Sequence, residues 1–418
     1  MNLIKTSILS SIATMIRIIT GFVVNKVIAL YVGPAGIAQI GQLQNFFSII
    51  SNLSNGAINQ GVTKFTSFYS DDTKKQKIYI NAAFTIAFWA SLLTGILVVV
   101  FNKSLSIMLL NDASFSKLFI SIGVLIIFYS INSILLAIVN GMKNIRKFTI
   151  INVLSSLFSL GISLLLTIKW GLNGALYSFV ISQTLIIFIT ISLIFKESWF
   201  RELRLMKIER DTIKSYSKYT IMALVHVVTA PVSYIIVRNY ITDTLSMRDA
   251  GYWQSIGKIS DTYLMLITMT LSIYYLPRLS EIKDDFLLRK EILSGYKIII
   301  PVLTVMLILI YFLKDFIIII LYSNEFLEMK QLFLFQLIGD FFKIASWLIS
   351  FNMVVKEMTK HVIMTELFYS FTFTTLSIVF IKYFGLIGVT YSYSITYILY
   401  FFMVAFILRR ILFMKTNK

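Results

Sequence analysis

Five basic residues lie inside long apolar segments, where a charged side chain has a high energetic cost: Arg17, Lys26, Arg238, Lys258 and Lys343. A charge in hydrocarbon costs about 3 kcal/mol or more, so each base needs a partner or a water-filled cavity. The acids before residue 196 are Asp71, Asp72 and Asp112, all outside the apolar segments. A cavity lined by these bases would be net positive, and we expect it to bind an anion.

The predicted cationic site comprises Arg17, Lys26, Lys64, Arg238 and Lys258. Arg17 lies near the middle of its segment, where its side chain cannot easily reach the membrane surface, so we expect it to line the cavity. Lys26 and Arg238 lie near the ends of their segments, so they fit both a cavity and snorkelling to the surface. Arg17 and Lys26 are on opposite faces of a straight helix, and we expect a bend at Gly21 if both reach one cavity.

Two acid–base pairs have a spacing of three residues, which is one turn of a helix. They are Lys258 with Asp261 and Asp340 with Lys343. Each pair fits two interpretations, namely a pair that neutralises itself or a polar lining of the cavity. The predicted polar lining comprises Gln39, Gln42, Asn45, Asp261, Asp340 and Lys343.

The composition excludes several other kinds of chemistry. The chain has no cysteine and two histidines, so it offers no disulfide, thiolate metal site or cysteine nucleophile, and we expect no metal or other cofactor. Charged residues make up 14% and hydrophobic residues 57% of the 418 residues, against about 25% charged residues in globular proteins. A soluble enzyme is therefore excluded. The net charge of +18 would suggest nucleic acid for a soluble protein, but here we expect no nucleic-acid partner.

The elements that position these residues are apolar segments of about 20 residues, each long enough to cross a bilayer as a helix. Twelve such segments are predicted: 8–32, 37–62, 78–101, 117–140, 148–168, 172–195, 218–240, 251–277, 298–321, 331–355, 361–381 and 386–408. The predicted fold class is an all-α integral membrane protein, with twelve transmembrane helices in two pseudo-symmetric six-helix lobes around a central cavity.

The distribution of Lys and Arg predicts the orientation, because cytoplasmic loops carry an excess of these residues. With a cytoplasmic N-terminus, 26 of the 38 bases lie on the cytoplasmic side and seven on the opposite side. We therefore expect both termini to be cytoplasmic.

An internal repeat predicts the domain organisation. Gly171-Leu172-Asn173-Gly174 opens the sixth segment, and Gly385-Leu386-Ile387-Gly388 opens the twelfth in the same way. Ala35-Gly36 and Ala250-Gly251 open the second and eighth segments at nearly the same offset. Two parallel copies of six helices are typical of transporters. The predicted divisions are an N-terminal lobe, a cytoplasmic linker, a C-terminal lobe and a cytoplasmic tail, at residues 1–195, 196–217, 218–408 and 409–418.

Several short motifs occur in order along the whole chain. They are Gly33-Pro34-Ala35-Gly36, Gly61-Val62-Thr63-Lys64, Gly251-Tyr252-Trp253-Gln254 with Ile259-Ser260-Asp261, Leu276-Pro277-Arg278-Leu279-Ser280 and Gln336-Leu337-Ile338-Gly339-Asp340. In these motifs the sequence resembles the Wzx polysaccharide flippases of Gram-negative inner membranes, within the multidrug/oligosaccharidyl-lipid/polysaccharide exporter superfamily. The likeness is to flippases of O-antigen and enterobacterial common antigen intermediates.

The resemblance implies a multi-pass transporter of the bacterial inner membrane that works by alternating access. It would move an undecaprenyl-pyrophosphate-linked oligosaccharide from the cytoplasmic to the periplasmic leaflet. Membrane lipids, the polymerase and chain-length regulator of the same pathway, and H⁺ or Na⁺ as a coupling ion are the partners to expect. The anionic pyrophosphate fits the predicted cationic cavity, and the amides of the second segment would face sugar hydroxyls.

Two alternatives remain open. A cation-coupled multidrug exporter of the same superfamily would need buried carboxylates, for which Asp261 and Asp340 are the deep candidates. A membrane enzyme such as a polymerase would need a large loop or an acid–base constellation, and the longest loop, of about 22 residues, offers neither. We therefore expect no enzymatic activity.

Overall fold

The computed structural model describes residues 3–271, 275–282, 284–356 and 358–412. These residues form helices and contain no strand, so the all-α prediction is confirmed. The helices pack into two compact units. Unit 1 comprises Met1–Val32 and Gln39–Pro231, and unit 2 comprises Gly33–Ala38 and Val232–Lys418. The lobe boundaries predicted from the sequence stay predictions.

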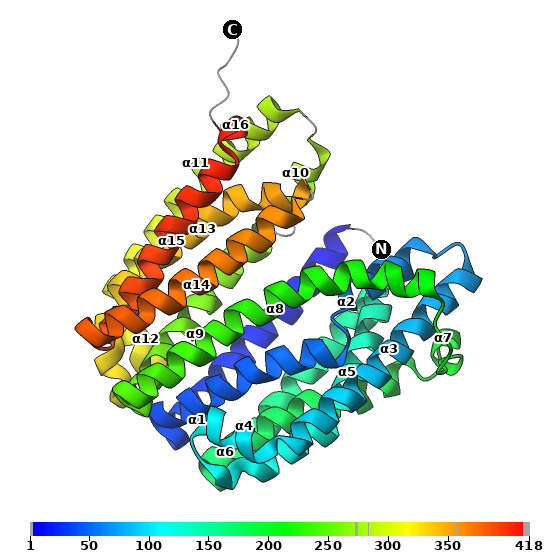
Figure 1. The fold of residues 1–418 in the computed structure, drawn as a ribbon, viewed down its shortest axis with the longest axis horizontal. Coiled ribbons are helices and arrows are strands. Elements are labelled where there is room, and N and C mark those ends of the chain that lie inside the picture. The colour runs from blue at the N-terminus through cyan, green and yellow to red at the C-terminus, as the bar shows by residue number, and fades with distance from the viewer. Residues whose placement is uncertain (1–2, 272–274, 283, 357, 413–418) are drawn as a thin grey trace. The chain divides into compact units, whose positions relative to one another are not determined.

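Figure 1 colours the helices of the two units in chain order, from blue to red. Those up to the unit boundary are α1 Leu3–Ser54, α2 Asn59–Phe68, α3 Thr73–Val100, α4 Asn102–Leu110, the 3-10 helix η1 Ala113–Phe115, α5 Ser116–Gly141, α6 Ile145–Ile194, α7 Ser198–Arg201 and α8 Arg210–Thr244. Those that follow are α9 Met247–Thr270, α10 Leu276–Glu281, α11 Asp285–Phe312, α12 Lys314–Leu321, the 3-10 helix η3 Asn324–Leu332, α13 Phe333–Val355, α14 Thr359–Phe384, α15 Ile387–Ile407 and α16 Arg409–Leu412. The unit boundary lies within α8.

Eight helical segments of the described chain are long and apolar enough to cross a membrane. Two of them, Ala13–Ser54 and Ile145–Ile194, contain 42 and 50 residues, which is more than twice the length that one crossing needs. The chain is therefore a membrane protein. Helices α8 and α9 cover much of two further predicted segments without being among the eight, and the count of twelve stays a prediction.

The two longest helices each contain one glycine that is not helical. Gly33 has φ 70° within α1, and Gly171 has φ 54° within α6. Between α14 and α15, Gly385 has φ 65°. A left-handed backbone strains any residue with a Cβ atom, so glycine is required where the chain turns back. Within α1 the residue with a non-helical backbone is Gly33, and the bend expected at Gly21 stays a prediction.

The second glycine of each repeated motif lies against the helix that precedes the turn. A Cβ atom on Gly174 would lie 1.8 Å from the carbonyl oxygen of Leu166, and one on Gly388 would lie 2.3 Å from that of Phe380. In both copies the contacted carbonyl belongs to the residue eight positions earlier. The repeated sequence therefore corresponds to a repeated local structure, a left-handed glycine followed by a close contact between two helices.

The predicted linker, residues 196–217, is part of unit 1 and packs on its helix α3. Backbone N–H groups of Arg204 and Met206 donate to Asn81 Oδ1 and Thr85 Oγ1 of α3, at 3.0 and 3.1 Å. The buried Tyr216, in the first turns of α8, donates its hydroxyl to the carbonyl of Tyr79 at 3.1 Å. Buried apolar residues of α2, α3 and α5 pack around it and form a core of unit 1.

Within unit 2, the segment Gly33–Ala38 packs tightly on α9. A Cβ atom on Gly251 would lie 1.9 Å from the carbonyl oxygen of Pro34. The motif Gly33-Pro34-Ala35-Gly36 and the motif that begins at Gly251 therefore meet, backbone against helix. This contact gives Gly251 a structural role that its place in the repeat alone does not reveal.

Replacing Gly251 by alanine should therefore destabilise the protein strongly, because the new methyl group overlaps a backbone atom that cannot move alone. We expect a loss of about 2–3 kcal/mol of unfolding free energy, the upper part of the range for overpacking. Thermal unfolding of the purified protein measures it. Gly257→Ala on the same helix is the matched control, since nothing lies within 4 Å of its Cβ position and alanine favours a helix by about 1 kcal/mol. Equal unfolding temperatures for the two variants would contradict the close contact.

Candidate functional site

A buried carboxylate lies at the centre of a polar cluster in unit 2. Asp340 of α13 is fully buried and accepts a hydrogen bond from the hydroxyl of Tyr393 at 2.8 Å. It also accepts from the hydroxyls of Ser260 and Tyr263 on α9. The Gln336 amide, one turn before Asp340, donates to Ser260 Oγ at 3.2 Å. Three helices, α9, α13 and α15, therefore meet around one acid.

Lys343 extends this cluster toward the exposed face of α9. Its ammonium lies 3.7 Å from Asp261 Oδ1, and the side chain of Asp261 is 76% exposed whereas that of Lys343 is 10% exposed. The ammonium also lies 5.4 Å from the Trp347 ring and 5.8 Å from the Tyr397 ring. Aromatic rings and one carboxylate therefore compensate this base.

The two members of each pair interact electrostatically but do not form a direct ion pair, so both interpretations stay predictions. Within the described chain, Lys258 forms no ion pair with Asp261, and Asp340 forms none with Lys343. Lys343 instead reaches across to α9, and Asp340 is held by hydroxyl groups. Residues one turn apart share a face of a helix, but neighbouring helices offer closer partners in this packed interior.

Arg238 is buried in unit 2 beside an amide and an indole ring. Only 3% of its surface is exposed, and its guanidinium donates to Gln254 Oε1 and lies 5.4 Å from the Trp253 ring. Lys258, which lies on α9 together with Trp253 and Gln254, is half-buried. The structure thus places Arg238, Lys258, Asp261, Asp340 and Lys343 in one unit, on α8, α9 and α13.

A group of tyrosines completes the polar interior of unit 2, and the sequence predictions did not include it. The hydroxyls of Tyr234 and Tyr369 lie 3.5 Å apart, and the Tyr369 and Tyr397 rings are 4.9 Å apart. Tyr393 and Tyr397 are also in contact, at 4.8 Å. Tyr393, Tyr397 and Tyr400 follow a spacing of four and three residues, the one signal that could have identified a tyrosine face on α15.

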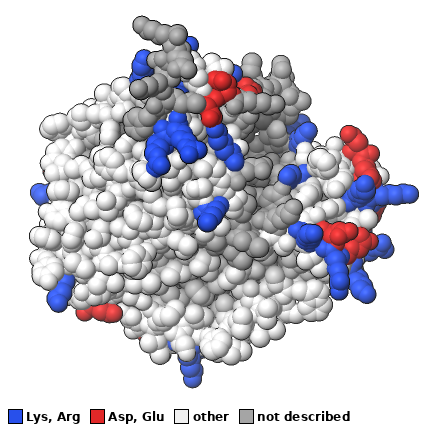
Figure 2. All heavy atoms as spheres, turned by 45° about the horizontal axis from the view of Figure 1, so that its top comes forward, with Lys and Arg blue, Asp and Glu red and all other residues white. Residues whose placement is uncertain are grey.

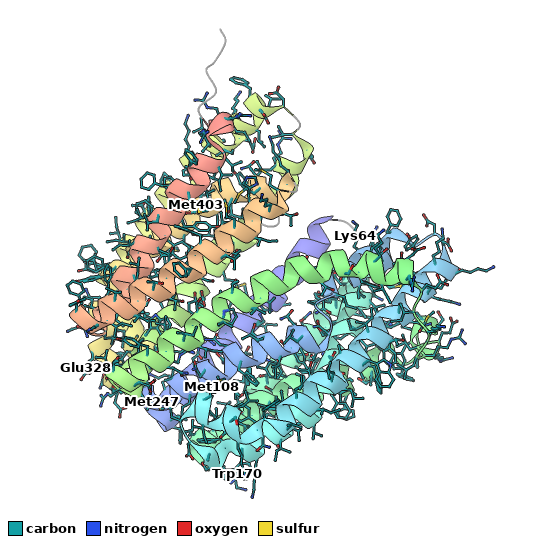
Figure 3. The ribbon with its side chains drawn as sticks, in the orientation of Figure 1. Lys64, Met108, Trp170, Met247, Glu328 and Met403 are labelled. Atoms are coloured by element: carbon teal, nitrogen blue, oxygen red, sulfur yellow. The ribbon has the colours of Figure 1, made fainter. Side chains whose placement is uncertain are left out.

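The other predicted bases lie in unit 1 and are more accessible. Arg17 is exposed on α1, and Lys26 is half-buried on the same helix. Lys64 is exposed on α2, and Figure 3 shows it at the opposite end of unit 1 from Trp170, which precedes the turn at Gly171. Among the described residues, the guanidinium of Arg17 has no hydrogen bond or ion pair. A cavity shared by these bases and those of unit 2 stays a prediction.

The amides of the second predicted segment are largely engaged within unit 1. Gln39 donates to the carbonyl of Leu110 at 3.1 Å, and Gln42 is 2% exposed. Asn59 donates to Ser133 Oγ at 2.7 Å. Asn45 differs, because its buried Nδ2 has no hydrogen-bond acceptor among the described residues. Of the predicted polar lining in unit 1, Asn45 is therefore the amide with a free donor.

The described residues contain no group of three or more His, Asp or Glu side chains that could hold a metal ion. Basic side chains gather in separate clusters on the face drawn in Figure 2, and most of that face is uncharged. The chemistry that the candidate site can perform is therefore recognition of polar and anionic groups by hydroxyls, amides and fixed cations.

Comparison with known proteins gives a family and a fold. Residues 3–283 match the family model described as "Polysaccharide biosynthesis protein". The chain is 26% identical over 407 residues to proteins named "Lipid III flippase" from Escherichia coli (strain K12) and Shigella flexneri, covering 96% of this chain and 97% of each relative.

Solved structures of membrane transporters share the fold. One is an inward-facing multidrug resistance MATE family transporter of the MOP superfamily, with a TM-score of 0.76, 12% identity, and coverage of 99% of this chain and 100% of that chain. Another is the lipid II flippase MurJ in an inward closed conformation, with a TM-score of 0.72, 17% identity, and coverage of 97% and 87%.

Proposed function

The chain belongs to the polysaccharide biosynthesis protein family, and from this premise we propose that it is a flippase for a lipid-linked oligosaccharide. Its cargo is an undecaprenyl-pyrophosphate-linked unit of the enterobacterial common antigen or O-antigen type, moved from the cytoplasmic to the periplasmic leaflet. The observation that carries the proposal is the likeness to proteins named "Lipid III flippase", which extends over nearly the full length of both chains.

The charge distribution supports an anionic cargo. Unit 1 places Arg17 and Lys26 on α1 and offers no carboxylate within its apolar helices before residue 196. The pyrophosphate of such a cargo carries negative charge, which a fixed cation binds by charge-assisted hydrogen bonds.

The proposal includes an orientation and partners. The chain lies in a bacterial inner membrane with both termini in the cytoplasm, and the excess of Lys and Arg on that side supports this orientation. The polymerase and chain-length regulator of the same pathway would receive the translocated unit. The coupling ion would be H⁺ or Na⁺. The chain acts as a transporter without chemical conversion of its cargo.

Reconstitution of the purified protein into vesicles tests the proposal. A fluorescent undecaprenyl-pyrophosphate-linked oligosaccharide is placed in both leaflets, and a membrane-impermeant quencher reports the exposed fraction over time. We expect the protected pool to become accessible rapidly only in vesicles that contain the protein. Accessibility that equals that of empty vesicles, with correctly folded protein, would overturn the proposal.

The second candidate is a multidrug exporter, which the TM-score of 0.76 to a MATE family transporter favours. A sequence identity of 12% supports a shared fold but not a shared function. Of the two candidate acids, the buried Asp340 accepts three hydroxyl donors, and the exposed Asp261 pairs with Lys343. Deletion of the gene tests this candidate, because an exporter should give a shift across a drug-susceptibility panel, whereas a flippase should give loss of surface glycan.

A further inference from the structure

Unit 2 has a pocket with a basic rim and an apolar floor at the end that carries α16. The pocket has a volume of about 410 Å³ and lies where the first turns of α14 meet the last turns of α15 and α16. His361, Arg409 and Arg410 line it, together with Met364, Met403, Phe406 and Ile407. Figure 3 shows Met403 toward the opposite end of unit 2 from Met247 and Glu328. The pocket therefore combines cations with an apolar surface at one end of the helices.

The two arginines of the pocket lie at its basic rim, and no carboxylate of the described chain pairs with them. Among the described residues, neither Arg409 nor Arg410 forms an ion pair. The Arg409 guanidinium lies 4.1 Å from the centre of the Phe406 ring, a cation–π contact that holds it at the rim. Both side chains are exposed, so they are available to an anion from outside the chain.

The acids near the start of α11 already have partners. Glu281 and Glu291 lie 3.3 and 3.9 Å from Arg278, and Asp285 pairs with Lys356. Asp284 accepts the backbone N–H of Leu287 at 2.8 Å and so caps α11. Helix α11 packs against α16, so these acids are the neighbours that could have neutralised the arginines. Among the described residues, these acids of α10 and α11 are therefore engaged elsewhere and leave Arg409 and Arg410 without a carboxylate partner.

Two exposed apolar stripes lead into the pocket. On α14, Met364, Leu367 and Phe371 follow a spacing of three and four residues, and on α15, Leu399, Phe402 and Phe406 do the same. Exposures of 42% to 75% along these stripes mark apolar helix surfaces that the described residues of unit 2 leave uncovered. Each stripe ends beside the basic rim. The surface thus combines two apolar stripes with the basic rim at which they end.

We propose that this pocket binds an anionic phospholipid of the bilayer. The phosphate lies between Arg409, Arg410 and His361, and the two acyl chains follow the stripes of α14 and α15. The start of α14, whose N-cap Met358 makes no side-chain hydrogen bond, adds the positive end of a helix dipole. Two stripes fit a lipid with two acyl chains better than a polyprenyl pyrophosphate, which has one. Basic pockets between helices at a membrane surface bind such head groups.

A second group of bases enlarges the positive surface near this pocket. Arg289, Lys290 and Lys297, with Phe286, Leu293 and Ser294, line a hollow of about 380 Å³ along one face of α11. Helix α11 packs against α16, so this second basic hollow and the pocket lie on neighbouring helices.

The test measures lipid binding to the full-length protein purified in a neutral detergent. Fluorescent phosphatidylglycerol is titrated, and phosphatidylcholine with the same acyl chains serves as the neutral probe. The double variant Arg409→Gln with Arg410→Gln should weaken phosphatidylglycerol binding by about 10- to 30-fold. Met403→Trp should also weaken it without a change in charge, because the larger ring fills the floor of the pocket.

The matched control is the double variant Lys314→Gln with Lys382→Gln, which also removes two bases of unit 2. Like Arg409, Lys314 lies over an aromatic ring, with its ammonium 3.8 Å from the centre of the Tyr311 ring. This control should bind phosphatidylglycerol as the unmodified protein does. Unchanged binding by the double arginine variant would overturn the proposal, as would equal affinity for phosphatidylcholine. Displacement of phosphatidylglycerol by an equal concentration of undecaprenyl pyrophosphate would assign the pocket to the cargo and overturn the phospholipid assignment.

Discussion

Replacing Arg17 by alanine should lower the rate of oligosaccharide-lipid translocation by about 10- to 100-fold, the range expected for loss of one charge-assisted hydrogen bond. The unfolding temperature should hardly change. The side chain of Arg17 is exposed, and within the described chain it has no ion pair that folding would lose. A variant with this combination separates a group that binds cargo from one that supports the fold. The quencher assay in vesicles gives the rate, and thermal unfolding gives the stability.

The transport rates of variants at position 17 should depend on the charge of the new side chain. Arg17→Lys keeps a cation and should transport better than Arg17→Ala, whereas Arg17→Glu places a repelling charge and should transport least. Lys117→Ala is the matched control, because Lys117 is another exposed base of unit 1, near the start of α5. If Arg17→Ala and Lys117→Ala transport equally well, Arg17 has no role in cargo binding.

Replacing Lys343 by alanine should affect stability more than transport, the opposite of what we expect for Arg17→Ala. Its side chain is 10% exposed and contacts Asp261, Trp347 and Tyr397. Lys343→Ala leaves a cavity and removes the partner of Asp261, so we expect it to lower the unfolding temperature more than Arg17→Ala does. Per molecule of folded protein, it should impair transport less than Arg17→Ala. The comparison uses the same two assays on the two variants.

Sequence patterns predicted the parts of the fold that depend on neighbouring residues. Apolar length predicted membrane helices, and the glycine pattern at Gly171 and Gly385 marked places where the chain turns with positive φ. These features follow from the local backbone, which a short segment determines. The break in α1 at Gly33, which has a left-handed backbone, was not predicted, although Gly33 lies in a motif that the sequence singled out.

The partners of the buried charges could not be predicted in this way. Asp340 is bonded by Ser260 and Tyr393, which lie 80 and 53 residues away in the sequence. Spacing along one helix reveals only the neighbours on that helix, and here it pointed to Lys343. Which side chains meet across helices depends on helix rotation and packing, which one sequence does not specify. The tyrosine face of α15 was visible as a pattern, but an aromatic stripe in a membrane helix also fits simple packing.

Replacing Asp340 by leucine should give the largest loss of stability among the single substitutions in unit 2. The carboxylate accepts hydroxyl groups of Ser260, Tyr263 and Tyr393, and Asp340 is fully buried. Leucine removes every acceptor, and each buried hydroxyl left without one costs about 1–3 kcal/mol. We expect a loss of roughly 3 kcal/mol or more of unfolding free energy, because the bonds form one connected network. Asp340→Asn keeps one carbonyl acceptor and should lie between leucine and the unmodified protein.

Asn352 supplies the matched control for this prediction, because it is equally buried on the same helix. Its amide donates only to the carbonyl of Ile349 at 2.9 Å, and its Oδ1 has no donor among the described residues. Asn352→Leu therefore removes a polar group that bonds nothing on another helix, and we expect the unfolding free energy to stay within about 1 kcal/mol of the unmodified protein or to rise. Tryptophan fluorescence during heating measures both variants. A similar loss in Asp340→Leu and Asn352→Leu would mean that burial of any polar group sets the stability of α13, whereas a loss confined to Asp340→Leu identifies the hydroxyl cluster as what joins α9, α13 and α15.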